Sequence, residues 1–324
     1  MNFSNLAARM FAIAVLISLA GPASAQQIYP SKPIRFVVPY PPGGSTTPVA
    51  RLIGEKLTER WGQPVLIDNR PGANTVIGTE AVAKSPADGY TILLTSVAYI
   101  SAPLVMSTHY DAVKDFAPVA TLIGAELLMA LHPGVPANNL RDFIALARSR
   151  PGQLNYATSA AGGSTHLAAE LLNILAGIKT QHIPYKGGGP ALADLMGGQV
   201  QFHFNTPLNL TPHIKGGKLK AIAVTGKARL ASLPQVPTFT EAGLPGLDVR
   251  EWMGVVAPAG TPKPIVDKLS TEIGKILDTP EVKDAVAKFG MAPIVSTPEQ
   301  MAALLQADLT KFAMIVKTAN IKSE

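Results

Sequence analysis

Ile34-Arg-Phe-Val-Val-Pro-Tyr-Pro-Pro-Gly-Gly-Ser-Thr-Thr-Pro48 connects an apolar, β-branched run to a helix start through a glycine-rich turn. The run 34–38 predicts a buried strand, and Thr47 and Pro48 are typical of an N-cap and a first helical residue. Free backbone N–H groups at a helix start attract an anion, and the helix dipole adds about half a positive charge there. The alternative is a capped tight turn that binds nothing. The donors would come from Gly43, Gly44, Ser45 and Thr46.

Two later segments repeat this order of strand, glycine turn and helix. Tyr156-Ala-Thr-Ser159 leads into a turn that ends at Gly163, and Ser164 and Thr165 open a helix. The segment Tyr185-Lys-Gly-Gly-Gly-Pro190 has the same form. In open α/β sheets, ligands bind outside the carboxyl ends of the strands. We therefore expect the turns of two α/β units to face each other across a ligand-binding cleft.

Short apolar runs alternate with helical patterns along most of the chain, which predicts an α/β fold. Two such units follow one another, and the C-terminal part adds helices at 263–277, 280–289 and 297–317. A strand at 252–257 is expected to return to the first sheet. This order predicts a discontinuous first domain (26–124 and 247–324) with a second domain (125–246) inserted into it. Each domain should be a mainly parallel sheet flanked by helices, with the connecting strands acting as a hinge.

The first 25 residues have the pattern of a secretory signal peptide. Arg9 precedes an apolar run from Met10 to Ala20, and the small residues Ala23-Ser-Ala25 follow. This is a positive region, a short apolar region and an A-x-A cleavage motif, and the run is too short for an ordinary spanning helix. The alternative is an uncleaved anchor. We expect cleavage after Ala25 and a mature protein in the periplasm.

Composition excludes several classes of protein. The chain has 28 Lys+Arg and 22 Asp+Glu, a formal charge of +6, which falls to +5 without Arg9. No dense basic cluster exists and aromatic residues make up only 6%, so a nucleic-acid footprint is not indicated. The absence of cysteine removes disulfides, thiolate chemistry and cysteine metal sites.

The sequence also lacks the motifs of nucleotide-binding proteins and common enzymes. It contains no G-x-x-x-x-G-K-[ST], no G-x-G-x-x-G after the first strand and no G-x-S-x-G. Its six histidines show neither H-x-x-x-H nor H-E-x-x-H spacing. We expect no catalytic residue, no cofactor and no metal. His166, beside the second glycine turn, is either a structural histidine or a ligand contact.

Several motifs together resemble those of one known family, the Bug-type solute receptors of tripartite tricarboxylate transporters. The resemblance covers nearly all residues after the predicted signal peptide, in order and with matching spacing. The motifs are Tyr29–Gly44, Asp68-Asn-Arg-Pro-Gly-Ala73, Asp88-Gly-Tyr-Thr91, Lys114-Asp-Phe-Ala-Pro118, Pro184–Pro190, Ala242-Gly-Leu-Pro245 and Ala257-Pro-Ala-Gly-Thr-Pro262.

This resemblance implies a two-domain periplasmic binding protein of the type II, Venus-flytrap kind. Such a receptor holds a small carboxylate between its domains with backbone amides, hydroxyl groups and waters, and delivers it to a two-component integral-membrane permease. The receptor itself is expected to be a monomer. By position, the resemblance places ligand contacts at Tyr40, Gly43, Gly44, Ser45, Thr46, Thr95 and Ser96 in the first domain, and at Ser159, Ser164, Thr165 and Asn205 in the second.

The chain departs from the family pattern at two positions. The family commonly has Asp where this chain has Thr47, and Asp before the asparagine that is here Asn205, where this chain has Phe204. Both changes remove an acid that could hold an ammonium group. The expected ligand is therefore a carboxylate without an amino group, and a flat aromatic or apolar one would suit Tyr40 and Phe204, with Phe204 covering it. In the alternative, Phe204 points into the core.

Two other functions stay open at the level of sequence. One is a ligand sensor that reports to a signalling partner instead of a permease. The other is a secreted α/β hydrolase or lyase that works from the same cleft. Membrane partners would distinguish the sensor from the receptor, and turnover assays would distinguish the enzyme.

Overall fold

The computed structural model describes residues 29–42, 46–158, 162–185 and 187–322. The chain divides into two units, Met1–Ser31 and Lys32–Glu324, and every named strand and helix belongs to the second. Of the first unit only residues 29–31 are described, so the predicted signal peptide lies outside the described residues. Among the helices that the structure describes, none is long and apolar enough to cross a bilayer.

The first sheet has six strands in the order β11-β4-β10-β3-β1-β2. β1 pairs in parallel with β2 and β3, whereas β10 is antiparallel to β3 and β4, and β11 is antiparallel to β4. β1 is almost continuously buried, as expected of a strand covered on both faces. The strands are β1 (Ile34–Val38), β2 (Val65–Asn69), β3 (Thr91–Ser96), β4 (Phe116–Glu126), β10 (Arg250–Pro258) and β11 (Ala292–Pro293).

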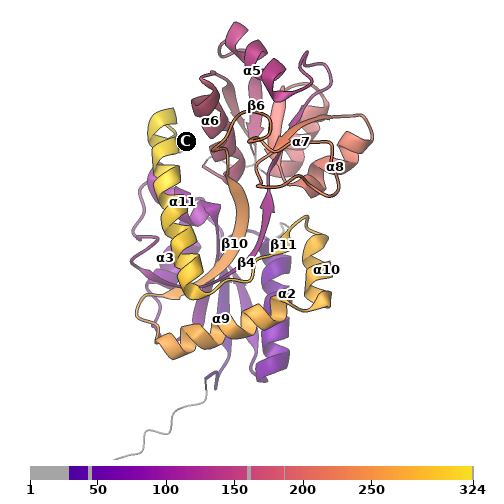
Figure 1. The fold of residues 1–324 in the computed structure, drawn as a ribbon. Coiled ribbons are helices and arrows are strands. Elements are labelled where there is room, and N and C mark those ends of the chain that lie inside the picture. The colour runs from indigo at the N-terminus through magenta and orange to yellow at the C-terminus, as the bar shows by residue number, and fades with distance from the viewer. Residues whose placement is uncertain (1–28, 43–45, 159–161, 186, 323–324) are drawn as a thin grey trace, which may run out of the picture. The chain divides into compact units, whose positions relative to one another are not determined.

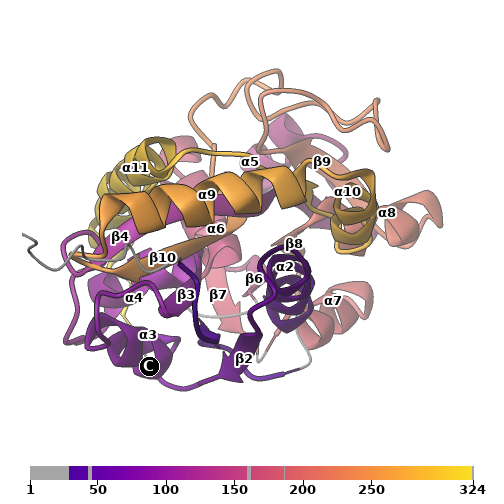
Figure 2. The same cartoon turned by 90° about the horizontal axis from the view of Figure 1, so that it is seen from below.

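Helices cover both faces of this sheet. α2 (Thr46–Trp61) leads to β2 and α3 (Val76–Ala83) leads back to β3, on the other side of β1. Because crossovers between parallel strands are right-handed, the two helices lie on opposite faces. Figure 2 shows α2 beside α9 (Lys263–Leu277), and α3 beside α4 (Val97–Val105).

The second sheet has five strands in the order β7-β6-β8-β5-β9. β6 is parallel to β7 and β8, and β5 is antiparallel to β8 and β9. The strands are β5 (Leu128–Leu131), β6 (Asn155–Thr158), β7 (Gln181–Pro184), β8 (Phe202–Asn205) and β9 (Lys220–Val224). Its helices are α5 (Leu140–Ser149), α6 (Ser164–Ala176), α7 (Gly188–Met196) and α8 (Pro207–Lys215).

Two long strands and the C-terminal helix connect the two sheets. A single residue, Leu127, separates the end of β4 from the start of β5, and β10 returns from the second sheet to pair along the whole length of β4. The C-terminal helices are α10 (Pro280–Ala287) and α11 (Pro298–Ala319). α11 packs against β4, α4 and α6. Figure 1 shows α11 beside α6. α11 therefore contacts elements of both sheets.

The structure confirms the α/β fold, the two sheets, the strand that returns to the first sheet and the three C-terminal helices. The prediction that each sheet is mainly parallel is wrong, because β10 and β11 make three antiparallel pairings in the first sheet and β5 makes two in the second. β10 enters the first sheet from the second, so it runs against its neighbours. The strands of the first sheet lie at 34–126 and 250–293, and those of the second at 128–224. The domain boundaries at 124/125 and 246/247 stay a prediction.

Candidate functional site

The end of β1 and the end of β3 meet through a pair of hydroxyl groups. Tyr40, which follows β1, shares a short hydrogen bond with Ser96, the last residue of β3. Ser96 also caps α4, because its Oγ accepts from the N–H of Ala98 at 3.2 Å. Thr95 beside it is fully buried, and its Oγ1 has no hydrogen-bond partner among the residues that the structure describes. Tyr40, Thr95 and Ser96, three of the predicted contact residues, therefore lie together at the carboxyl ends of β1 and β3.

A hydrogen-bonded asparagine fixes the ends of the first glycine-rich loop. Asn69 Nδ2 donates to the carbonyl oxygen of Tyr40 at 2.9 Å and to Oγ1 of Thr47 at 2.8 Å. Thr47 is thus a buried structural residue at the start of α2, which begins at Thr46. By the resemblance described above, this is the position where the family pattern has Asp. The predicted donors Gly43, Gly44 and Ser45 lie outside the described residues.

The start of α6 contacts the first sheet. The Ser164 hydroxyl donates a short hydrogen bond to Oε2 of Glu251, the second residue of β10. Thr165 is buried in the same turn of helix. His166 takes the structural role left open above, since its Nδ1 accepts from the N–H of Gly162 at 3.0 Å. Ser159 lies outside the described residues.

Glu251 is the functional candidate that sequence reasoning missed. Burial raises the pKa of its carboxyl group, and the hydrogen bond from Ser164 opposes that shift. Burial also holds the pKa of Tyr40 far above its ordinary value, and the charge of Glu251 raises it further. We call Tyr40, Ser96, Ser164 and Glu251 the Glu251 cluster. No sequence motif marks Glu251, because only the pairing of β10 with β3 brings it to the carboxyl end of β3.

Asn205 and Phe204 point to opposite sides of β8, as successive residues of a strand do. Asn205 is buried: its Nδ2 lies 3.1 Å from Nε2 of His203, and its Oδ1 accepts from the N–H of Thr206 at 2.8 Å. Phe204 is 1% exposed and stacks on Phe239 with ring centroids 5.8 Å apart. Of the two alternatives for Phe204, the structure has the one in which its ring lies in the core.

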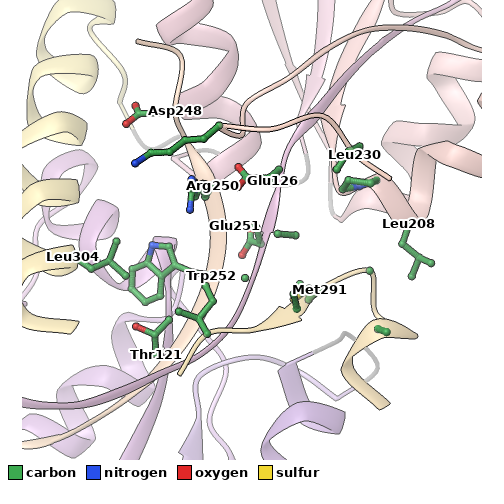
Figure 3. Close-up of a pocket in the computed structure, with 18 of the residues that line it drawn as sticks. Thr121, Glu126, Leu208, Leu230, Asp248, Arg250, Glu251, Trp252, Met291 and Leu304 are labelled. Atoms are coloured by element: carbon green, nitrogen blue, oxygen red, sulfur yellow. Dashed lines mark ion pairs between the residues drawn. The ribbon is translucent and has the colours of Figure 1, made fainter. Parts of the chain in front are cut away.

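A large pocket of about 1480 Å³ opens beside β4 and β10, as Figure 3 shows. Its walls include Trp252 of β10, Leu208 of α8, Met291 and Leu304, and it extends to Glu251. None of the predicted contact residues that the structure describes lines it. Within the same described ranges, no group of three or more His, Asp or Glu side chains could hold a metal ion. The pocket and the Glu251 cluster therefore share one residue, Glu251.

Comparison with known proteins shows to which family this chain belongs. Residues 49–321 match the family described as "Tripartite tricarboxylate transporter family receptor". The chain belongs to this family. It is 37% identical to protein BugT of Bordetella pertussis over 328 residues, which cover 99% of each chain.

Two solved structures that are similar to this chain contain named ligands. R. palustris Rpa4515 with adipate has a TM-score of 0.78 and 33% identity, and the match covers 91% of this chain and 99% of that one. MatC (Rpa3494) from Rhodopseudomonas palustris with bound malate has a TM-score of 0.76 and 32% identity, with 89% and 100% covered. Both ligands are small dicarboxylates without an amino group.

Two buried histidines of this receptor make its stability depend on pH. Burial lowers the pKa of His166 to about 3, with a further contribution from His182, and burial lowers that of His203 to about 4. Below pH 6.5 the unfolded chain takes up protons that the folded chain does not bind, so the folded state loses stability. Each histidine should contribute about 1.4 kcal/mol per pH unit down to its folded pKa. Between pH 7 and pH 5 we expect these two histidines together to lower the free energy of unfolding by about 4 kcal/mol.

Urea unfolding at several pH values measures this effect. A His203→Gln variant should show about half of the wild-type dependence between pH 6.5 and pH 5. Equal stability of the wild-type protein at pH 7 and pH 5 would contradict the prediction.

Proposed function

We propose that this chain is a periplasmic receptor that captures a small carboxylate between its two sheets and delivers it to a two-component membrane permease. The observation that carries the proposal is the Glu251 cluster. Ser164 at the start of α6 bonds to Glu251, whose charge also acts on Tyr40 at the end of β1. Residues beside two of the three glycine turns thus interact with Glu251, Ser164 through a hydrogen bond and Tyr40 through the charge of the carboxylate. The adipate and malate bound in two similar solved structures support a carboxylate ligand.

The chemistry at this place suits binding rather than turnover. Helix starts supply free N–H groups and a partial positive charge, and the buried hydroxyls of Thr95, Ser96 and Ser164 supply further hydrogen bonds. His166, the histidine nearest to Ser164 in the sequence, is engaged with the N–H of Gly162. It therefore does not serve Ser164 as a general base in this arrangement. We propose a receptor without catalytic activity.

The proposed ligand is a carboxylate without an amino group. Thr47 replaces an acid of the family pattern, and its hydroxyl is occupied by Asn69. Phe204 replaces the second acid, and its ring lies in the core. Neither position can hold an ammonium group, which loses its hydration at a cost of several kcal/mol if left unpaired. The ring of Phe204 therefore does not cover the proposed ligand.

Domain closure about the connecting strands is the proposed mode of capture. β4 and β5 are separated by Leu127 alone, and β10 pairs with β4 over its full length. Short connections of this kind permit hinge motion when the ligand makes contacts available only in the closed state. The signal-like residues 1–25 support export to the periplasm with cleavage after Ala25, and we propose a monomer.

A thermal-shift screen of residues 26–324 against carboxylic acids tests the function. A ligand that binds only the folded protein raises the free energy of unfolding by RT ln(1 + [L]/Kd), about 2.7 kcal/mol at 100 Kd. We expect adipate, malate or a related acid without an amino group to raise the melting temperature, with glutamate and aspartate as comparison ligands. A response to amino acids alone would contradict the proposed ligand class.

A further inference from the structure

Glu251 places an acid where the proposed function needs an anion to bind. The side chain accepts from Ser164, the first residue of α6 and a predicted contact of the ligand carboxylate. In the described part of the chain no lysine, arginine or histidine forms an ion pair with it. A carboxylate that enters this place would meet a second carboxylate, and two such groups in one site do not both stay ionised easily.

Among the residues that the structure describes, the groups packed around Glu251 leave its charge uncompensated. On β10 itself, Arg250 is engaged with Glu126 of β4, with Nη2 and Oε1 3.3 Å apart. From the end of β1, Tyr40 presents a phenol whose pKa burial raises far above its usual range, so it stays neutral. From α6, Ser164 is uncharged, and burial lowers the pKa of His166 to about 3, so it is neutral as well. From β3, Ser96 adds only a hydroxyl.

We propose that Glu251 takes up a proton from solvent when the ligand binds and donates it as a hydrogen bond to the ligand carboxylate. The proposal rests on the proposed function and makes Glu251 a specificity-determining residue. In the ligand-free protein the ionised carboxylate of Glu251 accepts from Ser164. In the complex Ser164 donates to the ligand, and the neutral acid of Glu251 supplies a second donor. The burial that raises the pKa of Glu251 already brings protonation closer to neutral pH.

This arrangement also gives a criterion for the class of ligand. A ligand without an amino group should bind together with one proton, because its negative charge replaces that of Glu251. A ligand with an ammonium group would pair with ionised Glu251 and take up no proton. The number of protons taken up per ligand therefore reports which of the two charge states Glu251 adopts.

Calorimetric titration in two buffers with different ionisation enthalpies, phosphate and Tris, measures proton uptake directly. With adipate and malate as probes at pH 6, 7 and 8, we expect uptake to rise towards one proton per ligand as Glu251 becomes ionised in the free protein. The affinity should then fall by up to about tenfold per pH unit. Binding of either acid without proton uptake at all three pH values would overturn the proposal.

Variants of Glu251 test whether this residue takes up the proton. Glu251→Gln keeps a hydrogen-bond donor and should bind the same acid with no proton uptake and no dependence of affinity on pH. Glu251→Asp should retain the uptake, which keeps the test valid if the glutamine variant is unstable. Asp308→Asn is the matched control, since desolvation raises the pKa of Asp308 as it does that of Glu251, and it should behave as the wild type. Undiminished uptake in Glu251→Gln would assign the proton elsewhere and overturn the proposal.

The outcomes separate this inference from the function on which it rests. Failure of adipate, malate and all related acids to bind would contradict the proposed function. Binding without proton uptake would contradict only the role of Glu251. A ¹³C NMR titration of the glutamate carboxyl groups, with Glu251→Gln to assign the signal, adds a test in the ligand-free protein. A midpoint for Glu251 at or below that of an exposed glutamate would overturn the proposal.

Discussion

Replacing Trp252 with alanine is expected to lower the free energy of unfolding by about 3–5 kcal/mol. The indole is 2% exposed on β10, and its Nε1 donates to Oδ2 of Asp308 on α11 at 2.9 Å. The variant loses the buried ring, leaves a cavity and removes the donor of a buried carboxylate. Because α11 also packs against α6, this contact stabilises elements of both sheets. Urea unfolding at pH 7 measures the effect.

Two milder variants divide this loss into its causes. Trp252→Phe keeps an aromatic ring and removes the indole N–H, so we expect it to cost about 1–3 kcal/mol. Asp308→Asn keeps an oxygen that can accept from the indole and should cost less than Trp252→Ala. A loss below about 1 kcal/mol for Trp252→Ala would show that the stability of the fold does not depend on the packing of β10 against α11.

A single methyl group at Gly290 is expected to weaken ligand binding by about tenfold or more, a change of about 1.4 kcal/mol. Gly290 lies between α10 and β11, and a Cβ added there would stand 2.1 Å from Cβ of Leu208 on α8. An alanine at this position therefore pushes the segment before β11, a strand of the first sheet, away from α8, the helix that follows β8 of the second sheet. If ligand capture requires the two sheets to move towards each other, the added methyl group opposes this movement. Calorimetry with a bound acid measures the effect.

Gly62→Ala is the matched control for Gly290→Ala. Gly62 has φ +67° and Gly290 has φ +69°, so alanine at either position carries the same backbone strain. An added Cβ at Gly62 meets nothing within 4 Å. Both variants should lose a similar amount of stability from the positive φ, on the order of 1 kcal/mol, but only Gly290→Ala should lose affinity. Equal affinities in the two variants would contradict closure at this contact.

Much of the fold followed from local patterns in the sequence. β1 and α2 were predictable because a continuous apolar run, a glycine turn and an N-terminal proline occur in that order. The amphipathic α9 and the capped α11 were predictable from helical spacing and from Thr297 with Gln300. By contrast, α4 was not predicted, because it is apolar on all sides and contains Pro103. Periodicity gives no signal in such a segment.

The candidate site was predictable only where a loop motif marks it. The family resemblance pointed to Tyr40, Ser96 and Ser164, which the structure brings into the Glu251 cluster. The side on which Phe204 lies could not be read from the sequence, since β8 is buried on both faces and no alternation of polar and apolar residues distinguishes them. Glu251 could not be found at all, because its place depends on how β10 pairs in the sheet.

Calorimetric titration of the wild-type protein and of Ser164→Ala with adipate and malate tests the central claim most directly. The account predicts one acid bound per chain and weaker binding by the variant. The loss should be about 0.5–1.5 kcal/mol for a neutral hydrogen bond and up to ~3 kcal/mol for one to a charged group. Unchanged affinity in a folded Ser164→Ala protein, or the absence of binding to any small carboxylate, would contradict it.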